Sequence, residues 1–446
     1  MSKSKTAENQ GTRAVLASWI GTTMEYYDYA CYGLAASLVF AKLFFPTADP
    51  IVGTLLALSS FAIGYIARPA GALIFGHIGD RLGRKKVLIV TLTMMGVATF
   101  VIGLLPTYAQ IGALAPALLV LARVFQGVSA GGEYSGAILM TVEHSERSKR
   151  GFRGSLVNTG TTAGLVLANL VFLLVFLLPE EQLMAWGWRI PFLLSGVLVV
   201  IGLVMRLMVE ESPEFEATKN VGAVHKMPIV AVFKDAGLRV VLVALGTVAA
   251  GTIFTLTTVF SLTYARMHLG ISSSMMLAAL LPATVVILVC VPVFGLLSDR
   301  VGVRPLFLAG AASLVVLPFV WFALLDTGQY WWMLLGFALL YVGYSANYAV
   351  VPAYFSQVFP PEYRFSGMSI GFTIGVILGN GFAPAIATGL LDATGSWIAI
   401  AFYAAVAALI SLVAGLFLRT IPTDPEAEHH PGGVAARQID PAIVRD

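Results

Sequence analysis

A basic segment punctuated by glycine occurs twice in this chain, and this repeat constrains the fold more than any other feature. The first copy, Gly76 to Lys86, reads Gly-His-Ile-Gly-Asp-Arg-Leu-Gly-Arg-Lys-Lys. The second copy begins 219 positions later and runs from Gly295 to Arg304, with Gly, Asp-Arg and Gly at the same spacing. Each copy lies between two long apolar runs. Internal similarity at a fixed distance indicates two related halves.

The apolar runs predict an all-α membrane protein. Of the 446 residues, 58% are hydrophobic and only 11% are charged, whereas charged residues make up about a quarter of a soluble globular protein. A run of about 20 apolar residues crosses the hydrocarbon layer as a helix. Together with the repeat, the runs predict two pseudo-symmetric bundles of six helices each. The twelve spans are expected near residues 17–44, 51–76, 87–106, 112–142, 154–178, 189–209, 239–264, 274–297, 305–325, 330–356, 366–390 and 397–418.

The polar stretches between and beyond these spans divide the chain into five parts. We expect a disordered tail over residues 1–13, an N-terminal bundle over 14–209 and a C-terminal bundle over 239–418. Residues 210–238, which mix acidic and basic side chains, are the expected linker between the bundles. Residues 419–446 are rich in Pro, Gly and acidic residues and are expected to be a second disordered tail.

Lysine and arginine residues are distributed unevenly between two sets of loops. Twenty-two of the 27 fall in one set together with both termini, while the opposite set carries only Lys42, Arg189 and Arg266. The remaining two, Arg68 and Arg123, lie within spans. Because basic loops are retained in the cytoplasm, both termini are predicted to be cytoplasmic. The basic residues are spread over every such loop, so no nucleic-acid partner is expected.

Charged residues inside the spans of the first half are the candidates for chemistry. Glu25 and Asp28 lie three residues apart and share one face of the first span. Arg68 lies in the second span, and the fourth span carries Arg123, Gln126 and Glu133 on one stripe. Charged side chains in hydrocarbon are costly and are retained where they have partners or face water.

The spans of the first half thus contain three carboxylates, Glu25, Asp28 and Glu133, but only two arginines, Arg68 and Arg123. One carboxylate therefore lacks a full partner. A buried carboxylate without a partner tends to take up a proton near neutral pH. The hypothesis is therefore that Glu133, Asp28 or Glu25 carries a coupling proton.

The spans of the second half contain no Asp, Glu, Lys, Arg or His and offer hydroxyl and amide side chains instead. Tyr344 and Asn347 are the candidates there for contact with a solute, and Tyr29 is a candidate in the first half. The histidines lie outside the spans and no metal-ligand spacing occurs, so neither an enzyme nor a metal site is expected. Cys31 and Cys290 fall within spans and are interpreted as packing residues.

The repeated segment resembles the signature loop between helices two and three of the major facilitator superfamily, and Gly295 to Arg304 resembles its pseudo-repeat in the second half. More narrowly, the residues around Glu25 and Asp28, Ala67-Arg68-Pro69, the run from Arg123 to Glu133 and Trp186 to Phe192 look like the metabolite:proton symporter subfamily. Its members carry small organic acids such as shikimate, 2-oxoglutarate or citrate, or zwitterions such as proline and glycine betaine.

The resemblance implies alternating access, with the substrate at the midplane between the two halves. It also implies that the signature loop closes the cytoplasmic side. Asp80 would cap the N-terminus of a neighbouring helix, and Arg84 would pair with an acid such as Glu143. The residues assigned to this cytoplasmic gate are Gly76, Asp80, Arg81, Gly83, Arg84, Glu143, Asp299 and Arg300.

The leading hypothesis is a proton-coupled importer of a small mono- or dicarboxylate, shikimate-like, in a bacterial inner membrane. Arg123 and Arg68 would bind the anion, with Gln126, Tyr29, Tyr344 and Asn347 around it. The alternative is a zwitterionic osmolyte held by tyrosines through cation-π attraction. Tyr26 and Tyr27 stand where the family usually has Trp, and the chain lacks the heptad-bearing tail of the osmosensing carriers. The expected partners are the solute, protons and the lipid bilayer, with no cofactor, and the protein is expected to be a monomer.

Overall fold

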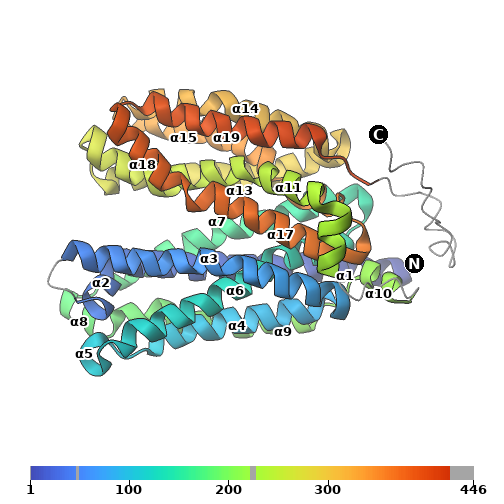
Figure 1. Ribbon diagram of the computed structural model, residues 1–446, viewed down its shortest axis with the longest axis horizontal. Coiled ribbons are helices and arrows are strands. Elements are labelled where there is room, and N and C mark those ends of the chain that lie inside the picture. Colours follow the sequence, from blue (N-terminus) through green and yellow to red (C-terminus); the bar gives the residue numbers. More distant parts are fainter. Residues whose placement is uncertain (1, 47–49, 221–227, 422–446) are drawn as a thin grey trace.

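The computed structural model describes residues 2–46, 50–220 and 228–421. Within these residues the secondary structure is helical. Figure 1 shows two groups of long helices side by side, one coloured blue to green and the other yellow to red. The first helix begins and the last helix ends at the same end of the molecule.

The N-terminal half is a bundle in which each long helix packs against two or more neighbours. The helix pairs α1 and α7, α3 and α6, α4 and α6, and α4 and α9 are in extensive contact. The elements of this half are α1 (Ser2–Ala35), α2 (Ala41–Phe44), α3 (Pro50–Leu82), α4 (Arg84–Leu104), α5 (Tyr108–Ile111), α6 (Leu114–Glu143), α7 (Arg150–Val175), α8 (Glu180–Ala185) and α9 (Ile190–Leu207).

The C-terminal half repeats this arrangement after a short connecting helix, α10 (Pro213–Asn220). Helix α14 packs against α15 and α19, and α11 packs against α17 and α19. The elements of this half are α11 (Pro228–Thr255), α12 (Ser261–Tyr264), α13 (Ser273–Val301), α14 (Val303–Leu325), α15 (Tyr330–Tyr348), α16 (Val351–Ser356), α17 (Arg364–Val376), α18 (Ala383–Thr394) and α19 (Trp397–Phe417).

Eleven helices of the described residues are long and apolar enough to cross a membrane. They coincide with the second to the twelfth predicted spans. The first predicted span, 17–44, is also helical, from Ser2 through Phe44. This first span is not one of the eleven helices counted above. Its sequence carries Glu25, Asp28 and several hydroxyl side chains. The all-α fold with a duplicated bundle is confirmed.

Two of the predicted polar segments contain helix that the sequence analysis did not expect. Residues 2–13, predicted to be disordered, form the start of α1, because a helix already nucleated in the membrane extends at little cost. The predicted linker 210–238 contains α10, and α11 begins within it at Pro228. Most of the predicted C-terminal tail, residues 422–446, lies outside the described residues.

The two halves meet mainly through two pairs of helices. Helix α7 packs against α13, and α3 packs against α17. In Figure 1, α7 and α17 lie at the boundary between the two groups of helices. In each pair the helix that ends in the repeated segment, α3 or α13, contacts a helix of the opposite half. We call the end of the molecule where α3 and α13 end and α7 and α17 begin the latch end.

Within the first half, α3 and α6 touch backbone to backbone, so this contact depends on glycine. A Cβ atom at Gly71 would lie 1.8 Å from the carbonyl oxygen of Val128, and one at Gly131 would lie 2.2 Å from that of Arg68. Neither carbonyl oxygen can rotate away as the tip of a side chain would.

Replacing Gly71 with Val should therefore destabilise the protein, by at least the roughly 1–3 kcal/mol typical of overpacking. The measurement is the thermal unfolding midpoint in detergent. Gly389→Ala is the matched control, because a Cβ atom there meets no other atom within 4 Å. An unchanged midpoint for Gly71→Val would contradict the packing described.

Candidate functional site

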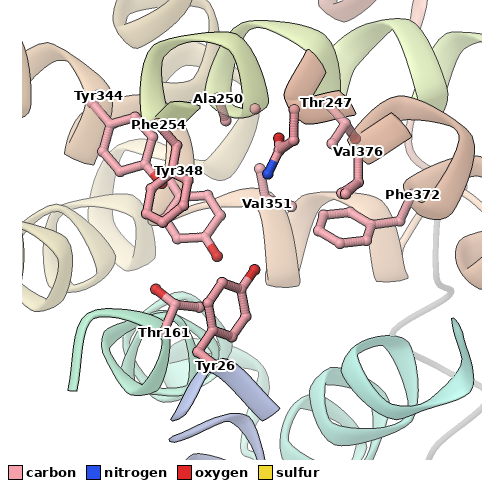
Figure 2. A pocket seen from close by; sticks show the side chains of 12 residues that line it. Tyr26, Thr161, Thr247, Ala250, Phe254, Tyr344, Tyr348, Val351, Phe372 and Val376 are labelled. Carbon is pink, nitrogen blue, oxygen red and sulfur yellow. The ribbon is translucent and has the colours of Figure 1, made fainter. Parts of the chain in front are cut away.

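A small cavity lies between the two halves and is lined by both. Figure 2 shows Tyr26 and Thr161 of the first half facing Phe254, Tyr344 and Tyr348 of the second. The cavity encloses about 30 Å³, which is about the share of one water molecule in the liquid. None of its lining residues is charged. These residues are Tyr26, Thr161, Thr247, Ala250, Gly251, Phe254, Tyr344, Tyr348, Val351, Phe372, Val376 and Asn380. A metabolite therefore requires the halves to move apart.

An irregular turn between two helices places a polar side chain at this cavity. Asn380 belongs to a π-helical turn, Ile377–Gly381, which connects α17 to α18. Its side chain lies over Gly251 of α11, where a Cβ atom would be only 2.2 Å from Asn380 Oδ1. This oxygen is buried and has no hydrogen-bond donor in the described part of the chain. It is therefore an acceptor available to a solute in the cavity.

Only one of the residues predicted to bind substrate lines the cavity. Tyr344 does so. Asn347 is fully buried against α14 instead, where its Nδ2 donates to the carbonyl oxygen of Phe307 at 3.2 Å. The other four, Arg68, Arg123, Gln126 and Tyr29, belong to a polar network inside the first half.

Glu25 and Arg68 form the part of this network closest to the cavity. Arg68 Nη2 lies 3.2 Å from Glu25 Oε1, and both side chains are buried. Neither oxygen of Glu25 has a hydrogen-bond donor among the described residues. Arg68 Nε donates to the hydroxyl of Tyr29 at 3.0 Å. Arg68 also lies within electrostatic reach of Tyr26, which follows Glu25 in the chain and lines the cavity.

Arg123 and Asp28 stand at opposite ends of a chain of hydrogen bonds. Arg123 donates to Gln126 Oε1 at 3.0 Å, and Gln126 donates to the hydroxyl of Thr99 at 2.6 Å. Thr99 in turn donates to Asp28 Oδ2 at 2.6 Å, and Ser195 donates to Asp28 Oδ1 at 2.9 Å. The carboxylate of Asp28 is thus held by two hydroxyl groups.

Aromatic rings enclose the guanidinium group of Arg123. Its Cζ atom lies 4.3 Å from the ring centre of Tyr29, 4.4 Å from that of Tyr32 and 4.8 Å from that of Phe61. Tyr29 also contacts Arg68, whose Cζ lies 4.3 Å from the same ring centre. The predicted binding residues Arg68, Tyr29, Arg123 and Gln126 are therefore one connected group, although only its Arg68 end approaches the cavity.

Glu133 has a partner that the sequence analysis placed elsewhere. Arg206, one of the 22 basic residues counted with the cytoplasmic loops although it falls within the predicted span 189–209, is 3% exposed near the end of α9. It forms an ion pair with Glu133 Oε1, and Thr91 donates to Glu133 Oε2 at 2.5 Å. Gly21 makes room for this pair, since a Cβ atom there would lie 2.0 Å from Arg206 Nη2. The expected excess of carboxylates over arginines within the membrane is wrong: with Arg206, three arginines (Arg68, Arg123 and Arg206) accompany the three carboxylates Glu25, Asp28 and Glu133, and Asp28 is held by hydroxyl groups rather than by an arginine.

At the latch end each repeated segment caps a helix of the opposite half. Asp80 at the end of α3 accepts hydrogen bonds from the backbone N–H groups of Phe365 and Ser366, at 3.0 and 2.8 Å, in the first turn of α17. Asp299 at the end of α13 accepts from those of Gly151 and Phe152, at 2.7 and 3.0 Å, in the first turn of α7. These carboxylates satisfy N–H groups that a helix cannot pair internally and complement the positive end of its dipole.

The first repeat adds a buried ion network to this cap. Arg84 Nε lies 3.4 Å from Glu143 Oε2, and Arg364 of the second half lies 3.3 Å from Glu143 Oε1. Both arginines are buried, although Arg364 had been assigned to a loop. Arg84 also donates to the carbonyl oxygen of Pro361 at 3.4 Å. The expected contacts of Asp80 and of Arg84 with Glu143 are thus present.

The remaining residues assigned to the gate have other surroundings. Gly76 lies against α17, where a Cβ atom would be 2.9 Å from Ser366 Cα. Gly83 has a φ of 106° between α3 and α4, which favours glycine. Arg81 and Arg300 are exposed on the last turns of α3 and α13.

The connection between the halves binds this network too, which the sequence analysis did not predict. Glu211 caps α4, accepting from the N–H groups of Arg84 and Lys85 at 2.9 and 3.2 Å. Glu214 on α10 pairs with Arg150 at 2.6 Å and with Arg364, so it joins the start of α7 to the start of α17. Burial favours the neutral form of Glu214, but Arg364 and Arg150 outweigh it and lower the pKa of Glu214 to about 2.

Comparison with known proteins adds the family. The family model described as Major Facilitator Superfamily matches residues 18–370 and 283–444. The chain belongs to the major facilitator superfamily. It is 36% identical over 417 residues to the shikimate transporter of Escherichia coli K12, covering 92% of this chain and 95% of that one. It is 40% identical over 421 residues to the inner membrane metabolite transport protein YhjE of the same organism, covering 91% and 93%.

A third relative has another substrate in its name. The proline/betaine transporter of Salmonella typhimurium is 34% identical over 424 residues, covering 93% of this chain and 84% of that one. Among solved structures, the proton:xylose symporter XylE matches with a TM-score of 0.71 at 16% identity, covering 93% and 97%, and FucP in the outward conformation with 0.65 at 14%, covering 92% and 100%. The resemblance to the superfamily and to its metabolite:proton symporter type is confirmed. The protein is a multi-pass membrane transporter and not an enzyme.

Glu214→Gln should loosen the latch end, because it removes the charge that holds Arg150 and Arg364 together. The pKa of Glu214 is lowered from an ordinary value of 4.5 to about 2, so its ionised form contributes stability above pH 4.5 that is lost only as the pH falls toward 2. Replacing Glu214 should therefore reduce the uptake rate without changing the shape of its pH profile between about pH 5 and 8.

The measurement is the initial rate at which cells take up a labelled substrate, as a function of pH. Glu216→Gln, an exposed position on the same helix, is the control and should match the parent. A displaced pH profile in Glu214→Gln would contradict this assignment.

Proposed function

We propose that this chain imports a small organic acid together with protons by alternating access, with the latch end facing the cytoplasm of a bacterial inner membrane. The expected substrate is a mono- or dicarboxylate of shikimate-like size. Two named relatives support a metabolite as substrate, one of them a shikimate transporter. The basic loops of the sequence support the orientation.

The observation that carries the proposal is the buried pair of Glu25 and Arg68, in which Glu25 directly precedes the cavity residue Tyr26. A buried carboxylate without hydrogen-bond donors is costly as an anion. Protonation removes this cost and also releases Arg68 from its one ion-pair partner among the described residues, 3.2 Å away. A substrate carboxylate then takes the place of the Glu25 charge, so proton and anion enter together without adding net charge to the site.

The other charged residues of the network have supporting roles in this proposal. Asp28 is the second candidate proton carrier because hydroxyl groups hold it and it forms no ion pair with an arginine of the described residues. Glu133 is fixed by Arg206 and Thr91 and is the least suited of the three. Arg123, whose guanidinium group also lies 4.3 Å from the ring centre of Tyr29, adds positive potential near Arg68.

The cavity supplies the rest of the recognition. Asn380 Oδ1 and the hydroxyl groups of Thr161, Tyr344 and Tyr348 suit a substrate that carries hydroxyl groups, while the aromatic rings suit an apolar ring face. The same aromatic lining is the observation that favours the second candidate, a zwitterion such as proline or glycine betaine, since a quaternary ammonium group is attracted to the faces of aromatic rings.

Replacing Glu25 with Gln should uncouple transport from protons. Glutamine resembles the protonated acid, so Arg68 stays available at every pH. We expect concentrative uptake in proteoliposomes under an inward pH gradient to fall at least tenfold, while exchange of labelled for unlabelled substrate continues. Glu180→Gln, at an exposed ion pair with Lys42, should behave as the parent. Gradient-driven uptake by Glu25→Gln at the parental rate would refute the role of this pair.

Competition distinguishes the two substrate classes. Uptake of one labelled organic acid is measured under an imposed pH gradient. Shikimate and other hydroxylated monocarboxylates should inhibit this uptake, and proline and glycine betaine should not. Replacing Arg68 with Gln should abolish binding of the acids. If glycine betaine is the strongest competitor and still binds after Arg68 is replaced, the zwitterion is the substrate class and the organic-acid proposal is wrong.

A further inference from the structure

The tenth membrane span is interrupted at the inner end of the cavity, and the interruption exposes a backbone acceptor. Helix α15 ends at Tyr348 and α16 begins at Val351. Pro352 lies four residues after Tyr348, and proline has no N–H group to complete the helical hydrogen bond. The carbonyl oxygen of Tyr348 therefore has no partner within its own helix.

Asn158 of α7, in the opposite half, supplies the missing donor. Its Nδ2 donates to the carbonyl oxygen of Tyr348 at 2.7 Å, and its Oδ1 accepts from the hydroxyl of Tyr134 at 2.7 Å. Asn158 is fully buried. One turn earlier on the same face, Gly154 admits Pro352, since a Cβ atom there would lie 2.9 Å from Pro352 Cβ. The amide thus bridges the two halves.

The bridge belongs to a layer between the cavity and the latch. The ring of Tyr134 stacks on Phe372 of α17, with ring centres 4.2 Å apart and planes at 20°. Along α7, Asn158 lies between Gly151 at the latch and Thr161 at the cavity. Along α17, Phe372 lies between Ser366 at the latch and the cavity residue Val376. We call Tyr134, Asn158, Tyr348 and Phe372 the floor of the cavity.

Tyr348 connects the floor to the site of binding. Its ring lines the cavity beside Phe254, and its hydroxyl is directed toward Tyr26 and Thr161 (Figure 2). Its carbonyl oxygen is the acceptor for Asn158. A solute that displaces this ring therefore acts on the residue whose backbone joins the halves.

We infer that Asn158 is a positioning residue that couples occupancy of the cavity to opening of the latch end, through its hydrogen bond with the Tyr348 carbonyl that Pro352 leaves unpaired. Breaking this bond in a dry interior leaves buried polar groups without partners, which is unfavourable. The floor therefore opens only after the latch has admitted water, or when a solute moves Tyr348. This inference rests on transport by alternating access and needs neither the proposed substrate nor proton coupling.

The test measures opening of the latch end directly. Met368, fully buried on α17 between Phe372 and the latch, is replaced by Cys in a chain whose Cys31 and Cys290 are replaced by Ala. The rate of reaction with a membrane-impermeant maleimide is measured in detergent without substrate or gradient. Failure of the proposed substrate or coupling would leave this readout unaffected.

Asn158→Leu should raise the labelling rate by roughly three- to tenfold, the range expected for loss of one net hydrogen bond. Pro352→Ala should raise it in the same direction, because alanine supplies an N–H group that competes for the Tyr348 carbonyl. The double variant should label no faster than the faster single variant, because both changes act on one bond. Asn169→Leu is the matched control: Asn169 lies on the same helix and donates to Leu165 within it at 2.8 Å.

Parental labelling rates in Asn158→Leu would overturn the inference. An increase in Asn158→Leu without one in Pro352→Ala would also overturn it, because the effect would then come from Tyr134 and not from the carbonyl. Folding is checked by monodisperse elution, and if Asn158→Leu fails to fold, Pro352→Ala alone decides. An increase equal to that of the Asn169→Leu control would assign the change to general loosening of α7 and refute the coupling role.

Discussion

The structure depends above all on two carboxylates that cap helices across the boundary between its halves. Asp80 holds the start of α17, and Asp299 holds the start of α7. Each carboxylate accepts two backbone N–H groups in the first turn of its partner helix, an interaction worth about 0.5–2 kcal/mol per cap. Because each comes from a copy of the repeated segment, one duplicated sequence explains both contacts.

The two caps are alike, yet their surroundings are not. The first copy continues into the buried network of Arg84, Glu143 and Arg364, which α10 reinforces through Glu214. In the second copy Arg304 donates to carbonyl oxygens of α19 in its own half. The second copy has Val303 at the position that corresponds to Arg84. Among the described residues the ion pairs that link the halves thus gather around Arg364 at the start of α17.

The two halves also differ in the side chains that they contribute to the candidate site. The first half holds its buried charges in a connected network, while the second contributes hydroxyl groups, one amide and aromatic rings to the cavity. A charge network within a single half persists while the halves move relative to each other. The solute is then contacted by both halves only when they approach, as alternating access requires.

Much of the fold was predictable because it follows from local pattern. The apolar runs predicted the helices, the repeat predicted the duplication, and the family resemblance implied the cap formed by Asp80. Partners within the membrane were less predictable, because depth and rotation of a helix depend on packing. Arg206 is an example: it was counted with the basic residues of the cytoplasmic loops although it falls near the end of the predicted span 189–209, and the structure buries it against Glu133. Pro352, four residues after Tyr348, was a signal for a free carbonyl that sequence reasoning could have used.

The roles of Glu211 and Glu214 could not be read from the sequence, because a short polar linker gives no indication of the surface on which it folds. Likewise, Tyr344 was one of several similar tyrosines, and only the packing of α15 distinguishes those that line the cavity, Tyr344 and Tyr348, from Tyr341.

The most direct test of the central claim is a distance across the latch end. Spin labels at the exposed positions Leu82 on α3 and Val301 on α13, with Cys31 and Cys290 replaced, report the separation of the halves by double electron–electron resonance. If the two caps hold the halves together, Asp80→Ala and Asp299→Ala should each shift part of the population to longer distances, and the double variant should shift most of it. A double variant with the distance distribution of the parent would contradict the account.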